Sequence, residues 1–129
     1  METILIIDDE AAVRRGFARR LQHAGYRTVE AKDGSEAIHL FAERSHEISA
    51  VTLDLAMPTT NGRETLAMLS SFAPDIPILI ATAYPVDDLI GRQPGSRGVA
   101  YLQKPFSAAE FLATLRRIID EVGPRTEGA

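Results

Sequence analysis

Two short runs of apolar residues limit the folds that this chain can adopt. Residues 4–7 read ILII and residues 78–81 read ILIA, with no polar position inside either run. A strand that is apolar at every position is buried on both faces, which is typical of parallel sheets covered by helices on both sides. Each run ends at a polar residue, Asp8 in the first case and Thr82 in the second. The runs therefore predict buried strands of a parallel sheet.

The remaining segments alternate between strand-like and helix-like patterns. Further strands are expected at residues 27–31, 50–55 and 99–103, and helices at residues 11–24, 35–44, 62–72 and 107–122, with a fifth, short helix around residues 87–92. The prolines and glycines of residues 85–98 limit that helix to about two turns. The helix at 62–72 is expected to turn Leu66, Leu69 and Phe72 inward. Five strands that alternate with five helices predict a doubly wound α/β fold with one parallel sheet and helices on both faces.

Five polar side chains stand where the expected strands end. They are Asp8, Asp9, Asp54, Thr82 and Lys104. In a doubly wound sheet, ligands bind outside the carboxyl ends of the strands, where the strand order reverses. Each residue alone has an ordinary structural explanation, since an acidic pair before a helix is commonly a cap and a lysine is commonly solvated. Their convergence at one edge favours a functional site.

Three carboxylates at one edge of a sheet repel one another, and a divalent cation with oxygen ligands relieves that repulsion. Magnesium is the natural candidate, because it is usually held by one or two carboxylates together with waters and a phosphate. We expect Asp9 and Asp54 as direct ligands and Asp8 as a ligand through water. The backbone carbonyl of Ala56 would complete the contribution of the protein.

The same residues include the groups that phosphoryl transfer requires. Asp54 is the expected phosphoacceptor, because a carboxylate beside a cation is a competent nucleophile. Lys104 would neutralise a carboxylate before transfer and pair with a phosphoryl oxygen afterwards. Thr82 offers a hydroxyl donor. Positioning and charge neutralisation supply most of the catalysis of phosphoryl transfer, so these residues form a plausible catalytic set.

Four motifs in the right order resemble the receiver domain of two-component response regulators. They are Asp8-Asp9, Asp54-Leu55-Ala56-Met57-Pro58 with Gly62 downstream, Thr82-Ala83, and Lys104-Pro105-Phe106. The resemblance implies the flavodoxin-like receiver fold with strand order 2-1-3-4-5. It also implies Mg²⁺-dependent transfer of a phosphoryl group to Asp54 from the phosphohistidine of a sensor histidine kinase or of a histidine phosphotransfer protein.

The resemblance implies roles for residues outside the acidic site. Pro105 is expected to follow a cis peptide bond. Tyr101 matches the switch aromatic of the family, although packing is an equally common role for an aromatic residue in a strand. Phosphorylation would draw Thr82 inward, Tyr101 would follow, and the face of the fourth helix, last strand and last helix would change its affinity for a downstream protein. The identity of that target and homodimerisation on activation are left open.

Two further positions bear on the lifetime of the phosphoryl group. Ala56, two residues after Asp54, and Tyr84, two residues after Thr82, would flank the path of an attacking water. Alanine cannot orient a water and tyrosine can obstruct one, so slow autodephosphorylation is expected.

A narrower resemblance concerns the context of the domain. Residues 2–5, 62–64 and 81–85 are similar to receivers at the C-terminus of hybrid sensor histidine kinases. The chain is therefore either such a receiver, excised, or a free-standing regulator. Its length fits one domain at residues 1–122, followed by a tail at residues 123–129 that is expected to be disordered.

Composition excludes several classes of partner. The net charge of −4 and the pI near 5.3 offer no basic surface for nucleic acid or anionic lipid. The opening segment is too short and too acidic for a signal peptide or a membrane span. Together with the absence of cysteine, this predicts a cytoplasmic protein. We interpret Arg14, Arg15, Arg19 and Arg20 as a solvated helix face, with docking of the histidine-bearing kinase domain as the alternative.

Two other functions compete with that of a phosphoacceptor domain. A phosphohydrolase that works through an aspartyl phosphate needs a second acid two residues after the nucleophile, and position 56 is alanine. A receiver-like scaffold that binds partners without being phosphorylated is consistent with the same fold. The complete set of site residues favours a phosphoacceptor signalling domain, rather than an enzyme, and the scaffold stays as the alternative.

Overall fold

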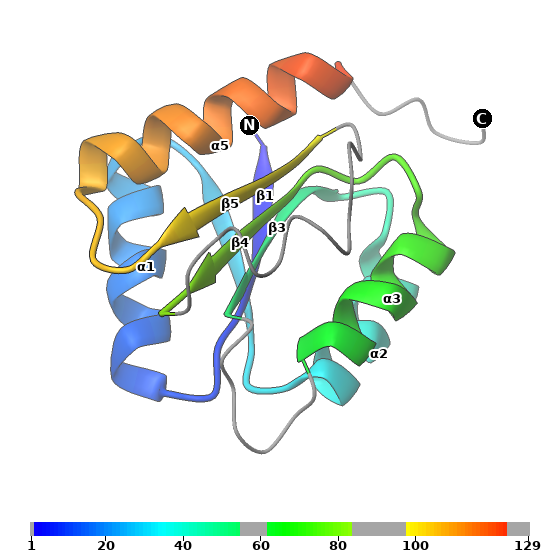
Figure 1. Ribbon diagram of the computed structural model, residues 1–129. Helices are drawn as coiled ribbons and strands as arrows, with labels where there is room; N and C mark the ends of the chain where they lie inside the picture. The colour runs from blue at the N-terminus through cyan, green and yellow to red at the C-terminus, as the bar shows by residue number, and fades with distance from the viewer. Residues whose placement is uncertain (1, 55–61, 84–97, 124–129) are drawn as a thin grey trace.

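The computed structural model describes residues 2–54, 62–83 and 98–123 and shows the doubly wound α/β fold (Figure 1). Its strands are β1 (Thr3–Ile7), β2 (Arg27–Ala31), β3 (Ile48–Asp54), β4 (Ile78–Thr82) and β5 (Val99–Gln103). Its helices are α1 (Ala11–His23), α2 (Gly34–Arg44), α3 (Gly62–Phe72) and α5 (Ala108–Val122). The sheet is parallel throughout with the order β2-β1-β3-β4-β5, so the predicted fold class and strand order are correct. The short helix expected around residues 87–92 lies outside the described residues.

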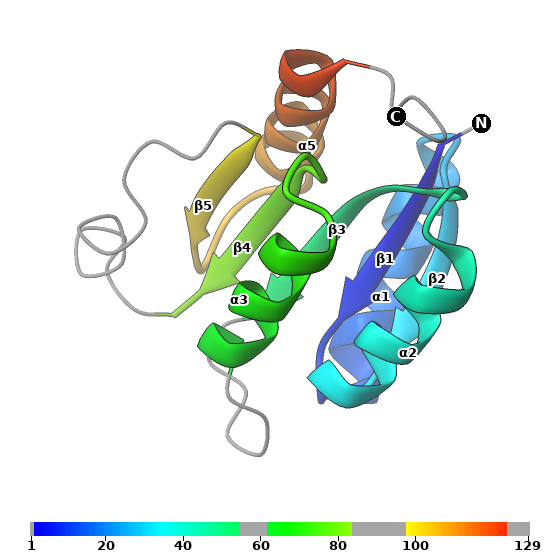
Figure 2. The same ribbon diagram turned by 90° about the vertical axis from the view of Figure 1, so that its right-hand side faces the viewer.

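The uniformly apolar strands follow from the two helical layers that cover the sheet. Helices α1 and α5 lie on one face, and α2 and α3 lie on the other (Figures 1 and 2). Because successive side chains of a strand point to opposite faces, Leu5 and Ile7 pack in the core beneath α2 and α3, whereas Ile4 and Ile6 pack beneath α1 and α5. A polar residue at any of these four positions would therefore be buried.

The structure corrects the inward face predicted for α3. Leu66 and Leu69 are buried as expected, but Phe72 is 60% exposed and Ala73 is buried instead. Positions 66, 69 and 73 fall on one side of a helix with 3.6 residues per turn, while position 72 lies well away from that side. The pattern of large apolar residues was misleading, because a small alanine completes the buried stripe.

Helix α5 is fixed at both ends. At its start, the Ser107 side chain accepts from the Glu110 N–H at 3.0 Å and the Glu110 carboxylate accepts from the Ser107 N–H, and this pair of bonds forms a capping box. Near its end, Glu121 accepts from the N–H of Gly98 at 2.9 Å. Gly98 has a φ of +77°, and a Cβ at this position would overlap the side chain of Val122. The connection into β5 thus packs directly against the last turn of α5.

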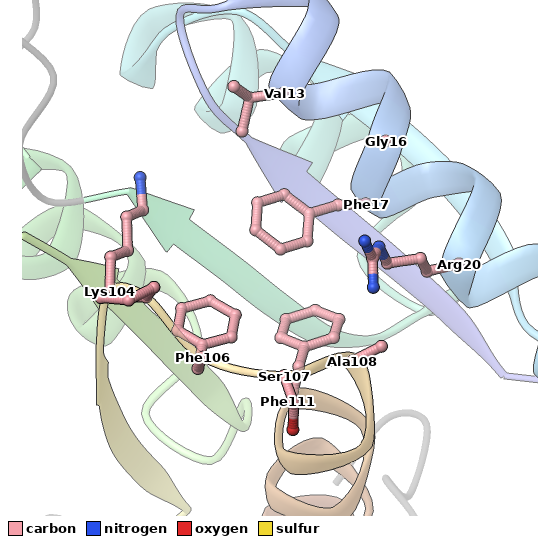
Figure 3. Close-up of a pocket in the computed structure, with 10 residues that line it drawn as sticks. Val13, Gly16, Phe17, Arg20, Lys104, Phe106, Ser107, Ala108 and Phe111 are labelled. Atoms are coloured by element: carbon pink, nitrogen blue, oxygen red, sulfur yellow. The ribbon is translucent and has the colours of Figure 1, made fainter.

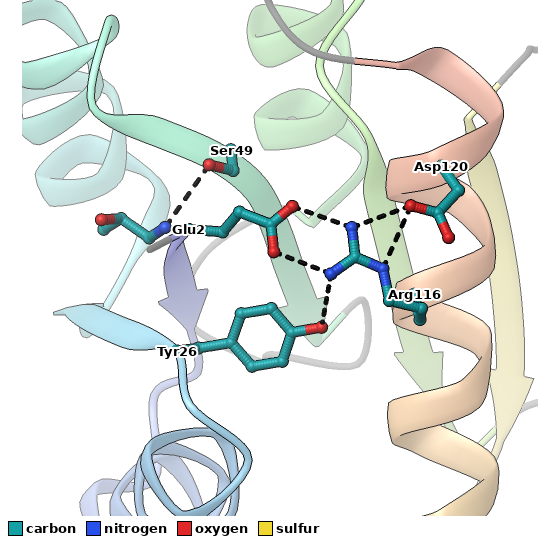
Figure 4. A network of polar contacts seen from close by, with 6 residues as sticks. Glu2, Tyr26, Ser49, Arg116 and Asp120 are labelled. Carbon is teal, nitrogen blue, oxygen red and sulfur yellow. Dashed lines mark hydrogen bonds and ion pairs between the residues drawn. The ribbon is translucent and has the colours of Figure 1, made fainter.

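A polar network joins the start of β1 to α5, at the edge of the sheet opposite the carboxyl ends of the strands (Figure 4). The guanidinium of Arg116 donates to both carboxylate oxygens of Glu2, at 2.7 and 2.8 Å, and to Asp120 at 2.9 Å. It also donates to the hydroxyl of Tyr26 at 3.3 Å. The residue before the first strand is therefore attached to the last helix.

Candidate functional site

Three carboxylates meet at the carboxyl end of the sheet. Asp8 follows β1 directly, Asp9 comes next, and Asp54 is the last residue of β3. Each offers a carboxylate oxygen, and these three oxygens lie within 4.8 Å of one another. Because β1 and β3 are neighbouring parallel strands, the topology brings the acids together as the sequence predicted.

Asp8 is buried and hydrogen-bonded through both its backbone and its side chain. Its N–H donates to the carbonyl of Ala31 at 3.1 Å, and its Oδ1 accepts from the N–H of Glu10 at 2.9 Å. The residue is only 2% exposed, and among the described residues its Oδ2 has no hydrogen-bond partner. Burial raises the pKa of Asp8, with smaller contributions from the charges of Asp54 and Asp9, while the Glu10 N–H and Lys104 oppose the shift.

This donor set fits a hard divalent cation. Carboxylate oxygens are the ligands that Mg²⁺ prefers, and a buried oxygen without a partner is unfavourable unless a ligand occupies it. Asp8, Asp9 and Asp54 would hold such an ion. The carbonyl of Ala56, which the sequence suggested as a further ligand, lies outside the described residues.

Lys104 and Thr82 stand beside the acids. Lys104 follows β5 and places its Nζ 3.2 Å from Oδ2 of Asp54. The peptide bond between Lys104 and Pro105 is cis, and the Lys104 N–H donates to the carbonyl of Thr82 at 2.7 Å. Thr82 ends β4, beside the strand that carries Asp54, and is fully buried. The backbone thus fixes both residues at the same edge of the sheet as the carboxylates.

Tyr101 belongs to β5, two strands along the sheet from β3, which carries Asp54. It is partly buried and packs against the core beneath α2 and α3. In the part of the chain that the structure describes, its buried hydroxyl has no hydrogen-bond partner, and burial raises its pKa. Tyr84, the other residue beyond the acids to which the sequence gave a role, falls outside the described residues.

Arg14 is a residue of the site that the sequence interpretation missed. We predicted a solvated face of four arginines, and Arg15, Arg19 and Arg20 are indeed exposed. The side chain of Arg14 is only 14% exposed, because it bonds Glu30 and the carbonyl of Asp8. Glu30, a charged residue in a strand beside the apolar β1, was the signal that could have indicated this pairing.

A hollow of about 430 Å³ adjoins the site on the α1 side. Its walls include Phe17, Phe106 and Phe111, whose rings face one another between α1 and the start of α5 (Figure 3). The ring centroids of Phe17 and Phe111 are 5.0 Å apart, and those of Phe106 and Phe111 are 5.9 Å apart. Arg20 and Lys104 also line the hollow, so an apolar concavity lies next to the lysine that contacts Asp54.

The sequence model of the response regulator receiver domain family matches residues 4–116 of the chain. The chain belongs to this family. Among curated proteins, this receiver domain is 39% identical over 123 residues to the response regulator MprA of Mycobacterium sp. (strain KMS), covering 94% of the chain and 52% of MprA. It is 33% identical over 119 residues to the sensor kinase CckA of Brucella abortus (strain 2308), covering 92% of the chain and 13% of CckA. The receiver domain thus spans about half of MprA and a small part of CckA.

A solved structure adds a chemical comparison. The response regulator TrrA of Thermotoga maritima, crystallised in complex with Mg²⁺ and BeF, matches the receiver domain with a TM-score of 0.75 and 29% identity, covering 92% of this chain and 99% of TrrA. Within residues 2–54, 62–83 and 98–123 of the receiver domain, no helix is long and apolar enough to cross a membrane.

Proposed function

We propose that this receiver domain accepts a phosphoryl group on Asp54 in a Mg²⁺-dependent reaction and passes the change to a protein partner. The observation that carries the proposal is the contact of Lys104 Nζ with Asp54 beside two further carboxylates, one of which has a buried oxygen without a described partner. The Mg²⁺ and BeF bound by TrrA support the same assignment by analogy.

The residues of the chain divide the reaction between them. A carboxylate oxygen of Asp54 attacks the phosphorus of a phosphohistidine, a P–O bond forms, the P–N bond breaks, and the histidine nitrogen leaves with the electron pair. Lys104 then pairs with an oxygen of the transferred group, and Thr82 donates to another. Asp8, Asp9 and Asp54 would hold Mg²⁺, which supplies positive charge against the phosphoryl oxygens.

The signal would travel through Thr82 and Tyr101. Thr82 stands two register positions from Tyr101 across the β4–β5 pair, because Tyr101 is opposite Ile80 and Gln103 is opposite Thr82. A movement of the Thr82 side chain toward the phosphoryl group would change the space beneath β5 that Tyr101 fills. Slow autodephosphorylation, which rests on Ala56 and Tyr84, remains part of the proposal.

The hollow beside α1 suggests how a phosphohistidine donor docks. Its three aromatic rings offer apolar contact area, and Arg20 at the edge offers a charge to an acidic partner. A helical histidine kinase or phosphotransfer domain seated there would bring its histidine near Lys104 and Asp54. The receiver unit would comprise residues 1–122, whether it acts alone or within a longer protein.

The decisive experiment compares two donors by intact mass. Acetyl phosphate should add one phosphoryl group to the wild type only with Mg²⁺, and Asp54→Asn should gain none. A phosphorylated cognate kinase should phosphorylate the wild type, while Arg20→Glu should slow that transfer and leave the reaction with acetyl phosphate unchanged.

The two donors test the acceptor chemistry and the docking surface separately. No gain from either donor in the wild type would favour the scaffold, which binds partners without phosphorylation. Equal rates for Arg20→Glu and the wild type with the kinase would remove the docking surface and leave the acceptor chemistry intact.

A further inference from the structure

We propose that Arg14, paired with Glu30, is a positioning residue that fixes the backbone at Asp8 and Asp9 so that their carboxylates can receive Mg²⁺. The inference rests on the proposed function, because it concerns the same cation site. It assigns a role to a charged pair that bonds the backbone carbonyl of Asp8 and, among the hydrogen bonds of the described residues, none of the three carboxylates.

The contacts of Arg14 are directed at the backbone. From the first turn of α1, its Nη1 donates to the carbonyl oxygen of Asp8 at 2.8 Å, and its Nε donates to the carboxylate of Glu30 at 3.0 Å. Glu30 lies in β2, opposite Ile6 of β1. One guanidinium therefore links a helix, an edge strand and the turn that carries the acids, and most of it is shielded from solvent.

These contacts complete the immobilisation of Asp8. Its N–H is bonded to Ala31 and its Oδ1 to the N–H of Glu10, so the carbonyl is the remaining backbone group of the residue. That carbonyl lies in the same planar peptide unit as the nitrogen and Cα of Asp9. Fixing the oxygen therefore fixes the direction in which the chain enters Asp9, while Oδ2 of Asp8 has no hydrogen-bond partner among the described residues.

The charges of Arg14 and Glu30 cancel. Removing both residues therefore tests their effect on the position of the Asp8 and Asp9 backbone without changing the net charge near the site. Replacing Arg14 alone leaves Glu30 uncompensated near three carboxylates, which attracts a cation and masks any loss of positioning. Replacing Glu30 alone has the opposite electrostatic effect. The double variant Arg14→Met/Glu30→Gln removes one positive and one negative charge, so the net charge near the site does not change.

The test is a calorimetric titration of the full chain with Mg²⁺. We expect the double variant to bind Mg²⁺ about tenfold more weakly than the wild type, at the lower end of the losses seen when outer-shell partners of a metal site are removed. A matched control is Arg44→Met/Glu47→Gln, which removes an ion pair of similar length, 2.9 Å, near the end of α2. This control should bind Mg²⁺ within twofold of the wild type.

The Mg²⁺ affinities of the double variant and the wild type separate the role of Arg14 from the proposed function. Binding by the folded double variant within twofold of the wild type would overturn the role of Arg14 and leave the proposed function standing. No binding of Mg²⁺ by the wild type would overturn both. If circular dichroism shows that the double variant is unfolded, Arg14→Lys is measured in its place. Lysine keeps the positive charge but lacks the two guanidinium nitrogens that bond Asp8 and Glu30 together. A Mg²⁺ affinity of Arg14→Lys equal to that of the wild type would then refute the inference.

Discussion

The hydroxyl of Tyr101 is a polar group placed among apolar side chains. It is buried, no described residue bonds to it, and burial raises its pKa, so it is held neutral. A buried polar group without a partner costs free energy, which a second conformation of the protein would recover if it supplied a partner or water. This makes Tyr101 a reasonable element of a two-state switch and a source of a simple stability test.

We predict that Tyr101→Phe keeps the fold and raises the free energy of unfolding by up to about 1 kcal/mol, because it removes the unpartnered oxygen and leaves the ring in place. Urea unfolding followed by circular dichroism measures the change. A loss of stability of that size would mean that the hydroxyl has a favourable partner in solution.

The individual site residues that could be predicted from the sequence were those that the strand topology brings together. Asp8, Asp54 and Lys104 were placed together because parallel strands end at one edge, and the structure joins them as expected. Arg14 was not predicted, because helical periodicity groups it with Arg15, whereas its actual partners lie on another strand and in a turn. A contact that depends on how a helix docks on a sheet cannot be read from one segment alone.

Among the elements, α5 and β5 are tied through Gly98. The glycine adopts a positive φ, and its missing side chain leaves room for Val122 at the end of α5. Its carbonyl also accepts from the N–H of Ile78 at 2.8 Å, and its N–H bonds Glu121. The last helix therefore meets the sheet at a point where only glycine fits.

We predict that Gly98→Ala lowers the free energy of unfolding by at least 1–2 kcal/mol, roughly the cost of the left-handed conformation alone, with the overlap with Val122 adding to it. Gly98→Ala/Val122→Ala should recover part of the loss. Gly16→Ala is the matched control: a Cβ there meets no atom within 4 Å, and a helical alanine should add about 0.5–1 kcal/mol. Thermal unfolding distinguishes the variants, and a neutral Gly98→Ala would contradict the packing argument.

The helices and strands that could be predicted were those whose sequence pattern is compatible with a single position in the fold. Uniformly apolar β1 and β4 had to be central, and Ser107 with Glu110 had to begin a helix. The rotation of α3 was wrong at Phe72, since it depends on which surface Ala73 finds in the folded protein. Local periodicity does not contain that information.

For the whole molecule, the buried carboxylate of Asp8 lowers the stability of the metal-free fold at neutral pH. Folding raises the pKa of Asp8, so the folded protein binds more protons than the unfolded chain at pH values from about 4, the ordinary value for aspartate, up to the raised one. The contribution of Asp8 to stability therefore falls as the pH rises through this window, and it is unfavourable above it. A bound cation would reverse this effect.

We predict that Asp8→Asn stabilises the metal-free protein by about 1 kcal/mol at pH 7, because it removes a buried charge while keeping an oxygen that accepts from Glu10. The gain should vanish at pH values below the window. Mg²⁺ should stabilise the wild type more than the variant, since binding to the folded state alone adds stability. Urea unfolding with and without Mg²⁺ tests this, with the exposed Asp75→Asn as a control expected within about 0.5 kcal/mol of the wild type. A less stable metal-free Asp8→Asn would contradict the prediction.

The bonds between Glu2 and Arg116 also have a mechanical consequence. β1 lies inside the sheet, with β2 on one side and β3 on the other, and the residue before it is bonded to α5. A force applied through a segment joined ahead of Glu2 would load the last helix at the same time as the central strand. Tension arriving from a neighbouring domain would therefore be shared between the two ends of the folded chain instead of peeling away its first strand.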